Sequence, residues 1–391
     1  MADRLLLVMA VPARGGAEEY GLTIGRAAVA RGWSVEAALP FAAGTETLRR
    51  DLHAAGIATA PLRYIDRMAR DDPEPPARAK LHAAAGFARV ARRFQPHVVH
   101  ITLTWPTFGY PFLVTSALLR LPTLVAFQLV PSGLFVPRRR RLVHQAMHAR
   151  GQRWIAVSDH GRRLIGALYR VDPATIGVIH NGAPAAEGES ANGDRDERRA
   201  ATRAELGLAP ESTVLLSLGR LHPQKGQAEL VRAAAGVHAR RPDVRLLIAG
   251  DGPERGRLEA LVAALGLQDV VVLLGHRRDA GRLMDAADLF VFPSHLEGTP
   301  FAMLEAMAHG LPVVAAAFGG VEEVVEDGET GVLTPVGRPD ELCTAIVGAL
   351  GDPDGLERLG AAGRERAAAF SQESMIAATM DELERLRSSR G

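Results

Sequence analysis

Val291-Phe-Pro-Ser-His-Leu-Glu297-Gly-Thr-Pro-Phe-Ala-Met-Leu-Glu305-Ala-Met-Ala-His-Gly-Leu-Pro-Val-Val314 is the stretch around which this chain is organised. The apolar run that leads into it, from Leu289 to Phe292, predicts a short buried strand. A polar loop follows, and Phe301 to His309 has the pattern of a helix that a glycine closes. A second buried strand ends the stretch. Glu297 is therefore expected in the loop and Glu305 on the helix, both beyond the carboxyl end of a strand.

These two glutamates and the helix start between them have the chemistry that a nucleotide sugar requires. A carboxylate accepts hydrogen bonds from two hydroxyls of a sugar or a ribose. The free backbone N–H groups near Thr299 to Met303 can donate to phosphate oxygens. Two solvated glutamates around an ordinary strand–helix turn would have the same spacing, so the spacing alone leaves both interpretations open.

The stretch resembles the E-x7-E motif of the retaining GT-B glycosyltransferases of family 4, and the likeness extends beyond the two glutamates. It includes Gly298, Leu304 to Ala308, Gly310 to Val314, Gly319-Gly320, Glu323 to Val325 and Asp327 to Gly331. The resemblance implies that Glu305 holds the ribose of a nucleoside diphosphate sugar and that Glu297 holds hydroxyls of its sugar. It also places four neighbours in the donor site: Gly298, Thr299, Pro300 and Phe301.

Three more loops follow predicted strands and resemble elements of the same family. Gly15-Gly16 and the run from Gly250 to Gly252 each come before a helix, where backbone can approach a ligand closely. The resemblance implies that these glycines and Gly219 lie against the donor nucleotide. The first loop lacks the dinucleotide pattern Gly-x-Gly-x-x-Gly, which argues against an NAD enzyme.

Arg220 and Lys225 bracket the loop that begins at Gly219. Arginine offers a planar fork and lysine a point charge, so together they can bind one diphosphate. Lys225 is one of only two lysines, with Lys80, in a chain that otherwise uses arginine. Two charges in a free loop would be unremarkable, but the resemblance implies that both residues are ligands of the leaving diphosphate.

Gln128 follows a predicted strand at a position where many family 4 enzymes have a histidine near the reacting sugar carbon. A glutamine cannot act as a base near neutral pH, although it can form a hydrogen bond with a sugar. Enzymes of this type need little help from a side-chain base, because the donor phosphate can take the acceptor proton. The departure weakens the expectation of catalysis without removing it.

Composition excludes several classes of protein. No apolar run reaches the roughly 20 residues that span a bilayer, and the run from Leu5 to Val11 is too short for a secretory signal. The single Cys343 excludes internal disulfides and a cysteine-based zinc site, which suits a reducing cytoplasm. We expect no metal and no cofactor, with the nucleoside diphosphate sugar entering as a substrate.

Charge is distributed unevenly along the chain. Residues 1–180 carry 24 basic and 12 acidic side chains, a net charge of +12, whereas the remainder carries 22 and 33, a net charge of −11. Six arginines lie between Pro137 and Arg153. This segment suits an anionic membrane surface or an acidic acceptor, and a solvated helix face is the simpler alternative. It lacks the interleaved aromatic residues of a nucleic-acid groove, so we expect no nucleic-acid partner.

Strands and helices alternate along the whole chain, which predicts an α/β protein with parallel sheets. Pro184 to Glu197 is poor in hydrophobic residues and predicts a flexible loop before a short helix from Arg198 to Leu206. The resemblance implies a GT-B architecture, in which two Rossmann-like domains face a cleft. The expected domains are an acceptor-binding domain over 1–180, a nucleotide-sugar-binding domain over 181–370, and a helix over 371–391 that crosses back to the first domain.

The predicted reaction is retaining transfer of a sugar from a UDP- or GDP-linked donor to the hydroxyl of an unknown acceptor, acidic or lipid-linked. We expect a cytoplasmic enzyme, with peripheral contact at the inner membrane face as the role of its arginines. Two alternatives remain open. A nucleotide-sugar epimerase of the same fold would need acid–base carboxylates in the first half, where none can be identified. A non-catalytic sugar-binding protein would fit the glutamine at position 128.

Overall fold

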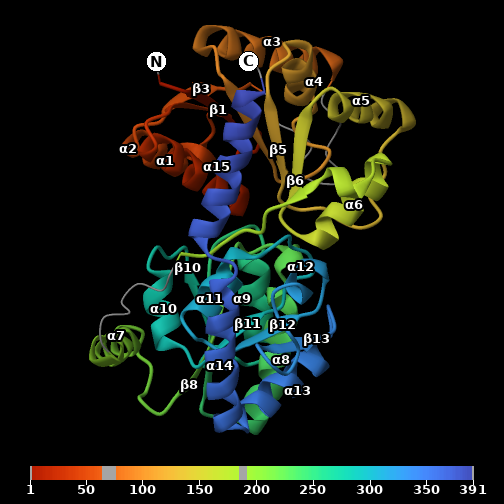
Figure 1. Ribbon diagram of the computed structural model, residues 1–391. Helices are drawn as coiled ribbons and strands as arrows, with labels where there is room; N and C mark the ends of the chain where they lie inside the picture. Colours follow the sequence, from red (N-terminus) through yellow and green to blue (C-terminus); the bar gives the residue numbers. More distant parts are fainter. Residues whose placement is uncertain (1, 64–75, 185–191, 390–391) are drawn as a thin grey trace. The chain divides into compact units, whose positions relative to one another are not determined.

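All the strands in the residues that the structure describes, 2–63, 76–184 and 192–389 of a computed structural model, pair in parallel and form two separate sheets (Figure 1). The chain divides accordingly into two units, Met1–His180 with Ser374–Gly391, and Asn181–Glu373. The predicted alternation of strands and helices is therefore confirmed, and each sheet has its own core.

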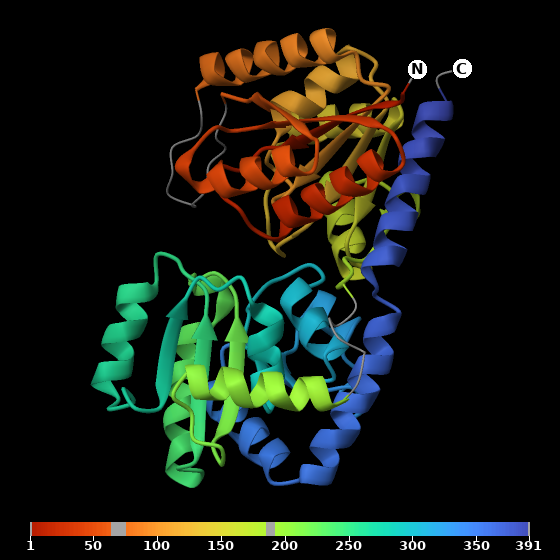
Figure 2. The ribbon, with the colours of Figure 1, turned by 90° about the vertical axis from the view of Figure 1, so that its left-hand side faces the viewer.

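The first unit contains a seven-stranded sheet in the order β3-β2-β1-β4-β5-β6-β7. Helices cover both faces, with α3 and α1 on opposite sides (Figure 2). A sheet covered on both faces needs nearly continuous apolar strands, and all six residues of β4 are buried. The strands are β1 Arg4–Met9, β2 Ser34–Leu39, β3 Ala58–Pro61, β4 Val98–Leu103, β5 Thr123–Phe127, β6 Gln152–Ala156 and β7 Gly177–Val178. The helices are α1 Gly16–Ala30, α2 Glu46–Ala54, α3 Ala77–Phe94, α4 Tyr110–Leu118, α5 Arg138–Ala149 and α6 Asp159–Tyr169.

The last helix, α15 (Gln372–Ser388), packs on the first unit although it ends the chain. Met380 and Leu383 are fully buried, and the buried hydroxyl of Thr379 lies 3.2 Å from that of Tyr20. Glu382 forms an ion pair of 3.2 Å with Arg153. Because exposed ion pairs stabilise proteins only weakly, the buried side chains hold this helix in place.

The second unit contains a six-stranded sheet in the order β10-β9-β8-β11-β12-β13. Its strands are β8 Thr213–Leu218, β9 Val244–Ala249, β10 Val271–Gly275, β11 Leu289–Phe292, β12 Val313–Ala316 and β13 Val332–Thr334. Its helices are α7 Asn192–Glu205, α8 Gln227–Arg240, α9 Arg255–Ala264, α10 Ala280–Ala286, α11 Phe301–Ala308, α12 Gly319–Glu322, α13 Pro339–Leu350 and α14 Pro353–Ala368. β11 and α11 have the bounds that the sequence predicted, to within one residue.

Helix α7 corrects one prediction from the sequence. The expected loop over Pro184–Glu197 is wrong from Asn192 onward, where α7 begins. The helix has few hydrophobic residues, and its arginines bind aspartates about 85 residues away in the sequence. The ion pairs are Arg195 with Asp285 at 3.5 Å, Arg198 with Asp285 at 3.0 Å, Arg199 with Asp288 at 2.5 Å and Arg203 with Asp288 at 2.7 Å. Local composition cannot reveal such partners, so the segment resembled a linker.

Two other expectations concern a charged segment of the first unit and the possibility of membrane-spanning helices. Residues 67–76 are rich in charged residues and proline, which predicts a loop, and most of this stretch lies outside the described residues. Within the described residues, the helices are all too short or too polar to cross a bilayer.

Two buried histidines make the stability of the first unit depend on pH. Burial lowers the pKa of His100 and of His144 to about 4. The ring of His144 stacks on Tyr169 at 4.3 Å, and its Nδ1 lies 2.8 Å from the carbonyl oxygen of Arg140. Because an unfolded histidine titrates near pH 6.5, the unfolded chain takes up protons first as the pH falls.

We predict that the free energy of unfolding decreases as the pH falls from about 6.5 to about 4, by on the order of 3 kcal/mol for each histidine. His144→Phe keeps a ring of similar shape but cannot titrate, so its melting temperature should decline less steeply over this range. Thermal melts between pH 7.5 and 4.5 measure the slope. His82→Phe, at an exposed position on α3, is the matched control. A slope in His144→Phe equal to that of the parent protein would contradict this account.

Candidate functional site

The order of strands in the second sheet creates a natural place for a ligand. From β8 the chain moves outward through β9 and β10, and it then returns to the other side of β8 as β11. The loops after β8 and β11 therefore leave the sheet side by side and turn to opposite faces. In open parallel sheets, ligands bind at this point, beyond the carboxyl ends of the strands.

Hydrogen bonds and a close backbone contact join the loops that follow β8 and β11. The side-chain amide of Gln224 donates to the carbonyl oxygen of Leu296 at 2.6 Å, and the N–H of His295 donates to the carbonyl oxygen of Gln224 at 2.8 Å. Gly226 has a left-handed φ of 67°, and a Cβ at this residue would lie 2.1 Å from the carbonyl oxygen of Pro293. Only glycine permits this approach, which fixes the spacing of the two loops.

This approach brings Lys225 and Glu297 into an ion pair. The ammonium of Lys225 binds Oε1 of Glu297, and the Ser294 hydroxyl lies 3.2 Å from the same oxygen. The side chains of Lys225 and Glu297 are 23% and 15% exposed, so water reaches the pair only in part. When a ligand binds, the ammonium of Lys225 can bind its phosphate, and the carboxylate of Glu297 can accept hydrogen bonds from its hydroxyls.

The loop after β9 lies equally close to the loop after β8. Gly250 has a φ of 146°, and a Cβ there would lie 1.9 Å from the carbonyl oxygen of Gly219. A Cβ at Gly252 would lie 2.3 Å from the carbonyl oxygen of Leu221, whose N–H donates to the carbonyl oxygen of Asp251 at 3.0 Å. These glycines therefore keep the backbone of Gly219 and Arg220 at the edge of the sheet.

Helix α11 starts at the same edge. Thr299 is buried, and the carbonyl oxygen of Pro300 accepts the N–H of Leu304 at 3.2 Å. The N–H groups of Phe301 and its neighbours belong to the first turn, which lacks acceptors within the helix. Glu305 lies one turn further along and is half-buried. The loop before α11 also packs closely against the start of α12, because a Cβ at Gly320 would lie 1.6 Å from the carbonyl oxygen of Gly298.

The electrostatic field of the loop after β8 favours an anion. Arg220 is exposed at its start and Lys225 lies near its end. Burial lowers the pKa of His222, and the nearby charges of Arg220 and Lys225 lower it further, against the opposing effect of Glu254. His222 is therefore neutral at pH 7, and its Nδ1 accepts the N–H of Gln224 at 3.3 Å. The two cations remain to bind a negatively charged group.

The remaining residues that the sequence singled out lie in the first unit. Gly15 is the extended residue before α1, and Gly16 is the first residue of that helix. Gln128 follows β5, is 7% exposed, and donates its backbone N–H to the carbonyl oxygen of Leu103 at 2.9 Å. All three lie at the carboxyl ends of strands in their own sheet, where ligands of parallel sheets bind.

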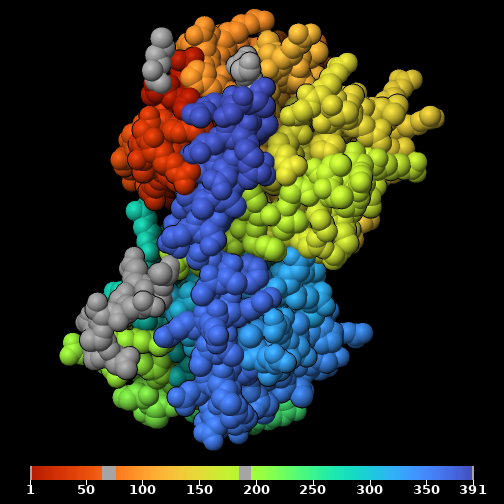
Figure 3. Space-filling view, viewed as in Figure 1, coloured from red at the N-terminus to blue at the C-terminus, as the bar shows by residue number. Residues whose placement is uncertain are grey.

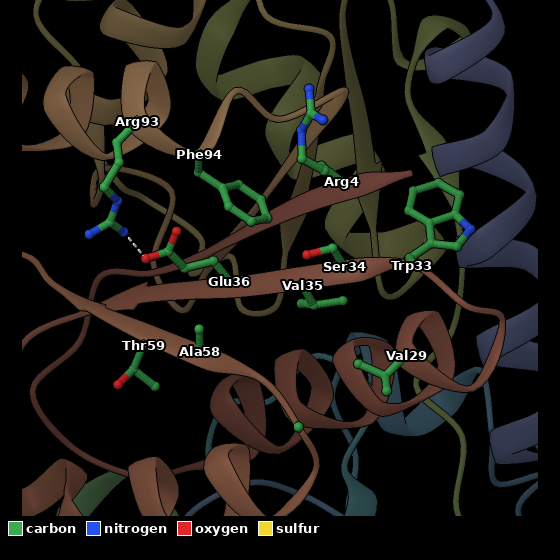
Figure 4. A pocket seen from close by; sticks show the side chains of 11 residues that line it. Arg4, Val29, Trp33, Ser34, Val35, Glu36, Ala58, Thr59, Arg93 and Phe94 are labelled. Atoms are coloured by element: carbon green, nitrogen blue, oxygen red, sulfur yellow. Dashed lines mark hydrogen bonds and ion pairs between the residues drawn. The ribbon is translucent and has the colours of Figure 1, made fainter. Parts of the chain in front are cut away.

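Another hollow lies in the first unit. It has a volume of about 690 Å³ and opens at the amino ends of β1, β2 and β3 (Figure 4). Its charged groups already have partners, because Arg93 pairs with the buried Glu36 and Arg4 donates to the carbonyl oxygen of Gln95 at 2.7 Å. Its position at the amino ends and its satisfied charges make it a weaker candidate. Groups of three or more potential metal-ligating side chains are absent from the described residues.

Three residues of the second-unit site were not assigned a role from the sequence. Gln224 joins the two loops, Ser294 contacts Glu297, and Asn181 donates its side-chain amide to the carbonyl oxygen of Thr299 at 3.0 Å. Gln224 and Ser294 lie inside stretches that the sequence did single out. Asn181 lies 118 residues from its partner, so the sequence alone gives no signal for that contact.

We predict that Gly226→Ala destabilises the second unit far more than Gly207→Ala. The two glycines have almost the same left-handed φ, 67° and 66°, but a Cβ at Gly207 has no atom within 4 Å. Both variants should lose about 1 kcal/mol from the backbone conformation, and only Gly226→Ala should also force the loops apart. Denaturant unfolding of both variants measures the difference. Equal free energies of unfolding would show that the two loops do not need this contact.

Two family models match the chain, and together they cover most of it. The model described as "Glycosyl transferase 4-like domain" matches residues 15–182, and the model described as "Glycosyl transferases group 1" matches residues 198–366. The second match contains Arg220, Lys225, Glu297 and Glu305. The two ranges fall on the two structural units.

Similar proteins agree with these matches. A D-inositol 3-phosphate glycosyltransferase 2 from Catenulispora acidiphila is 35% identical over 241 residues, which are 59% of this chain and 55% of that protein. The chain thus spans about half the length of the curated relatives it matches. The crystal structure of Anabaena Alr3699/HepE in complex with UDP-glucose has a TM-score of 0.78 at 24% identity and covers 97% of this chain and 100% of that one.

A sucrose-phosphate synthase from Thermosynechococcus elongatus has a TM-score of 0.76 at 22% identity and full coverage of both chains. The family models confirm the glycosyltransferase family that the E-x7-E stretch indicated, and the similar structures confirm the fold class. The chain belongs to the group 1 glycosyltransferases, and its two units are the two Rossmann-like domains of a GT-B glycosyltransferase.

Proposed function

We propose that this glycosyltransferase moves a sugar from a UDP- or GDP-linked donor to a hydroxyl group, with retention of configuration at the sugar carbon. The observation that supports this most directly is the pairing of Lys225 with Glu297 at the meeting point of the loops after β8 and β11. A diphosphate supplies the anion that the lysine needs, and a sugar supplies the hydroxyls that the carboxylate needs. The resemblance to a protein crystallised with UDP-glucose supports the same donor class.

In this proposal, Arg220 and Lys225 bind the diphosphate and neutralise the charge that develops on it. Such stabilisation of a leaving anion is commonly the largest contribution to catalysis. The first N–H groups of α11, near Phe301, bind phosphate oxygens. Glu305 accepts hydrogen bonds from the ribose hydroxyls. Glu297 accepts hydrogen bonds from sugar hydroxyls after Lys225 has left it to bind the phosphate.

The bond changes are then complete without a side-chain base. The acceptor oxygen forms a bond to the sugar carbon as the bond from that carbon to the diphosphate oxygen breaks. The electron pair of the broken bond goes to the diphosphate, and the acceptor proton passes to the leaving phosphate oxygen. Gln128 donates a hydrogen bond to the sugar, and Gly15 and Gly16 allow backbone to approach the diphosphate. No cofactor is needed.

We predict that Lys225→Ala lowers turnover about a hundredfold to a thousandfold, because one preorganised charge at the leaving anion is lost. The free energy of unfolding should change by no more than about 1 kcal/mol, since a partly exposed ion pair contributes little to stability. Turnover with UDP- and GDP-sugars, measured beside a thermal melt, gives both quantities. Arg232→Ala, which removes a cation from the side of α8, is the control. Near-normal turnover in Lys225→Ala would leave Arg220 as the sole phosphate ligand of this loop.

Substitutions of Glu305 and of Glu297 should affect different quantities, nucleotide affinity in one case and turnover in the other. We predict that Glu305→Gln weakens nucleotide binding, because an amide oxygen accepts hydroxyl hydrogen bonds less strongly than a carboxylate. Glu297→Gln should mainly lower turnover, because its hydroxyl contacts orient the reacting sugar. Calorimetric titration with UDP and GDP gives the affinities, and product analysis distinguishes transfer from epimerisation or mere binding. Parent-like values in both variants would remove the site assignment.

We further propose that the acceptor lies at an anionic membrane surface that α5 contacts. Arg138 and Arg139 are exposed on α5, and the exposed Phe135 and Leu142 lie beside them in sequence. Helix α5 lies on the outer surface of its unit (yellow in Figure 3). Cations interleaved with apolar side chains are typical of surfaces that bind anionic lipid head groups.

We predict that the protein sediments with vesicles of phosphatidylglycerol and phosphatidylcholine at low salt and is released at high salt. Replacing Arg138, Arg139 and Arg141 with serine should abolish sedimentation. The control replaces Arg78, Arg89 and Arg92 on α3, which removes the same charge from other exposed positions of that unit. Equal losses in the two triple variants would indicate a response to net charge only, and no binding at low salt would refute membrane contact.

A further inference from the structure

We propose that Asn181 is a positioning residue for the donor, because its side chain fixes the turn from which α11 begins. This inference rests on the proposed function, in which that turn receives the donor diphosphate. Asn181 is 4% exposed, and its Nδ2 donates to the carbonyl oxygen of Thr299 at 3.0 Å. Thr299 is itself 2% exposed, so water cannot readily replace the amide.

The backbone that carries Asn181 is fixed independently of this bond. Ala183 pairs with Ser371, accepting the N–H of Gln372 at 2.8 Å and donating its own N–H to Phe370 at 3.1 Å. A Cβ at Gly182 would lie 2.1 Å from the carbonyl oxygen of Ser371. Asn181 therefore reaches the Thr299 carbonyl from a rigid base, formed where the two segments that enter and leave the second unit run side by side.

The peptide that Asn181 holds has an unusual polarity. Because the next residue is Pro300, the Thr299–Pro300 peptide has a carbonyl oxygen and no N–H. That oxygen carries partial negative charge and would repel a diphosphate if it turned toward the site. The bond to Asn181 holds this oxygen and keeps it from turning toward the donor, which leaves the N–H groups of the first turn of α11 to bind the diphosphate. Asn181 thus acts on the donor through the backbone, without touching it.

Two variants test this role. Asn181→Ala removes the amide donor, and Asn181→Asp keeps the shape but places an acceptor against the Thr299 oxygen. We expect Asn181→Ala to raise the dissociation constant for UDP or GDP, whichever the parent binds, about tenfold. Asn181→Asp should raise it at least as much. The KM for the donor sugar should rise with it, while turnover at saturating donor falls less than about threefold. Calorimetric titration is done at a temperature at which thermal melts show every variant folded.

Gln152→Ala is the matched control. Gln152 is also a buried amide that donates to a backbone carbonyl, that of Leu113 at 2.8 Å, but it lies in the first unit. The Gln152→Ala variant should have a lower melting temperature and an unchanged dissociation constant for the nucleotide. An unchanged constant in Asn181→Ala, or parent-like binding in Asn181→Asp, would overturn the proposal. A parent protein that binds neither nucleotide would instead refute the proposed function, and this inference with it.

Discussion

The close approach of Gly226 to the carbonyl oxygen of Pro293 is the constraint on which the candidate site depends. The order of strands places the ends of β8 and β11 next to each other, but it does not determine how their loops meet. Backbone contact at Gly226 does so, and it brings Lys225 and Glu297 close enough to form an ion pair. Gly250 after β9 and Gly320 after β12 make similar close backbone contacts, with Gly219 and Gly298. The result is a rim of tightly packed loops on which a few charged side chains are held at fixed positions.

This arrangement explains why the net charge of a region says little about its site. The chain beyond residue 180 has a net charge of −11. The loop after β8 nevertheless presents Arg220 and Lys225 and keeps His222 neutral. Many of the region's acidic residues lie away from the site, as do the aspartates that bind the arginines of α7. In the first unit, the excess of arginine includes Arg138 and Arg139, which are exposed on α5. Local placement therefore decides what each surface can bind.

The sequence predicted what local patterns determine. The strand Leu289–Phe292, the helix from Phe301 and the positions of Glu297 and Glu305 were all found from the alternation of apolar, polar and glycine residues. Contacts made across long stretches of chain were not found. Gln224 lies 72 residues from Leu296, and Asn181 lies 118 residues from Thr299. The start of α7 was predicted as a flexible loop for the same reason: its composition is polar, and its arginines bind distant aspartates. Tertiary partners override local tendency in each of these cases.

Hydrogen–deuterium exchange with and without saturating UDP or GDP would test the location of the donor site most directly. The account predicts that bound nucleotide slows exchange in the loops after β8, β9 and β11 and in the first turn of α11, including the segments around Lys225 and Phe301. It predicts no change at the amino ends of β1, β2 and β3, where the hollow of about 690 Å³ lies. Protection around that hollow, with unchanged exchange in the loop from Gly219 to Gly226, would contradict the central claim.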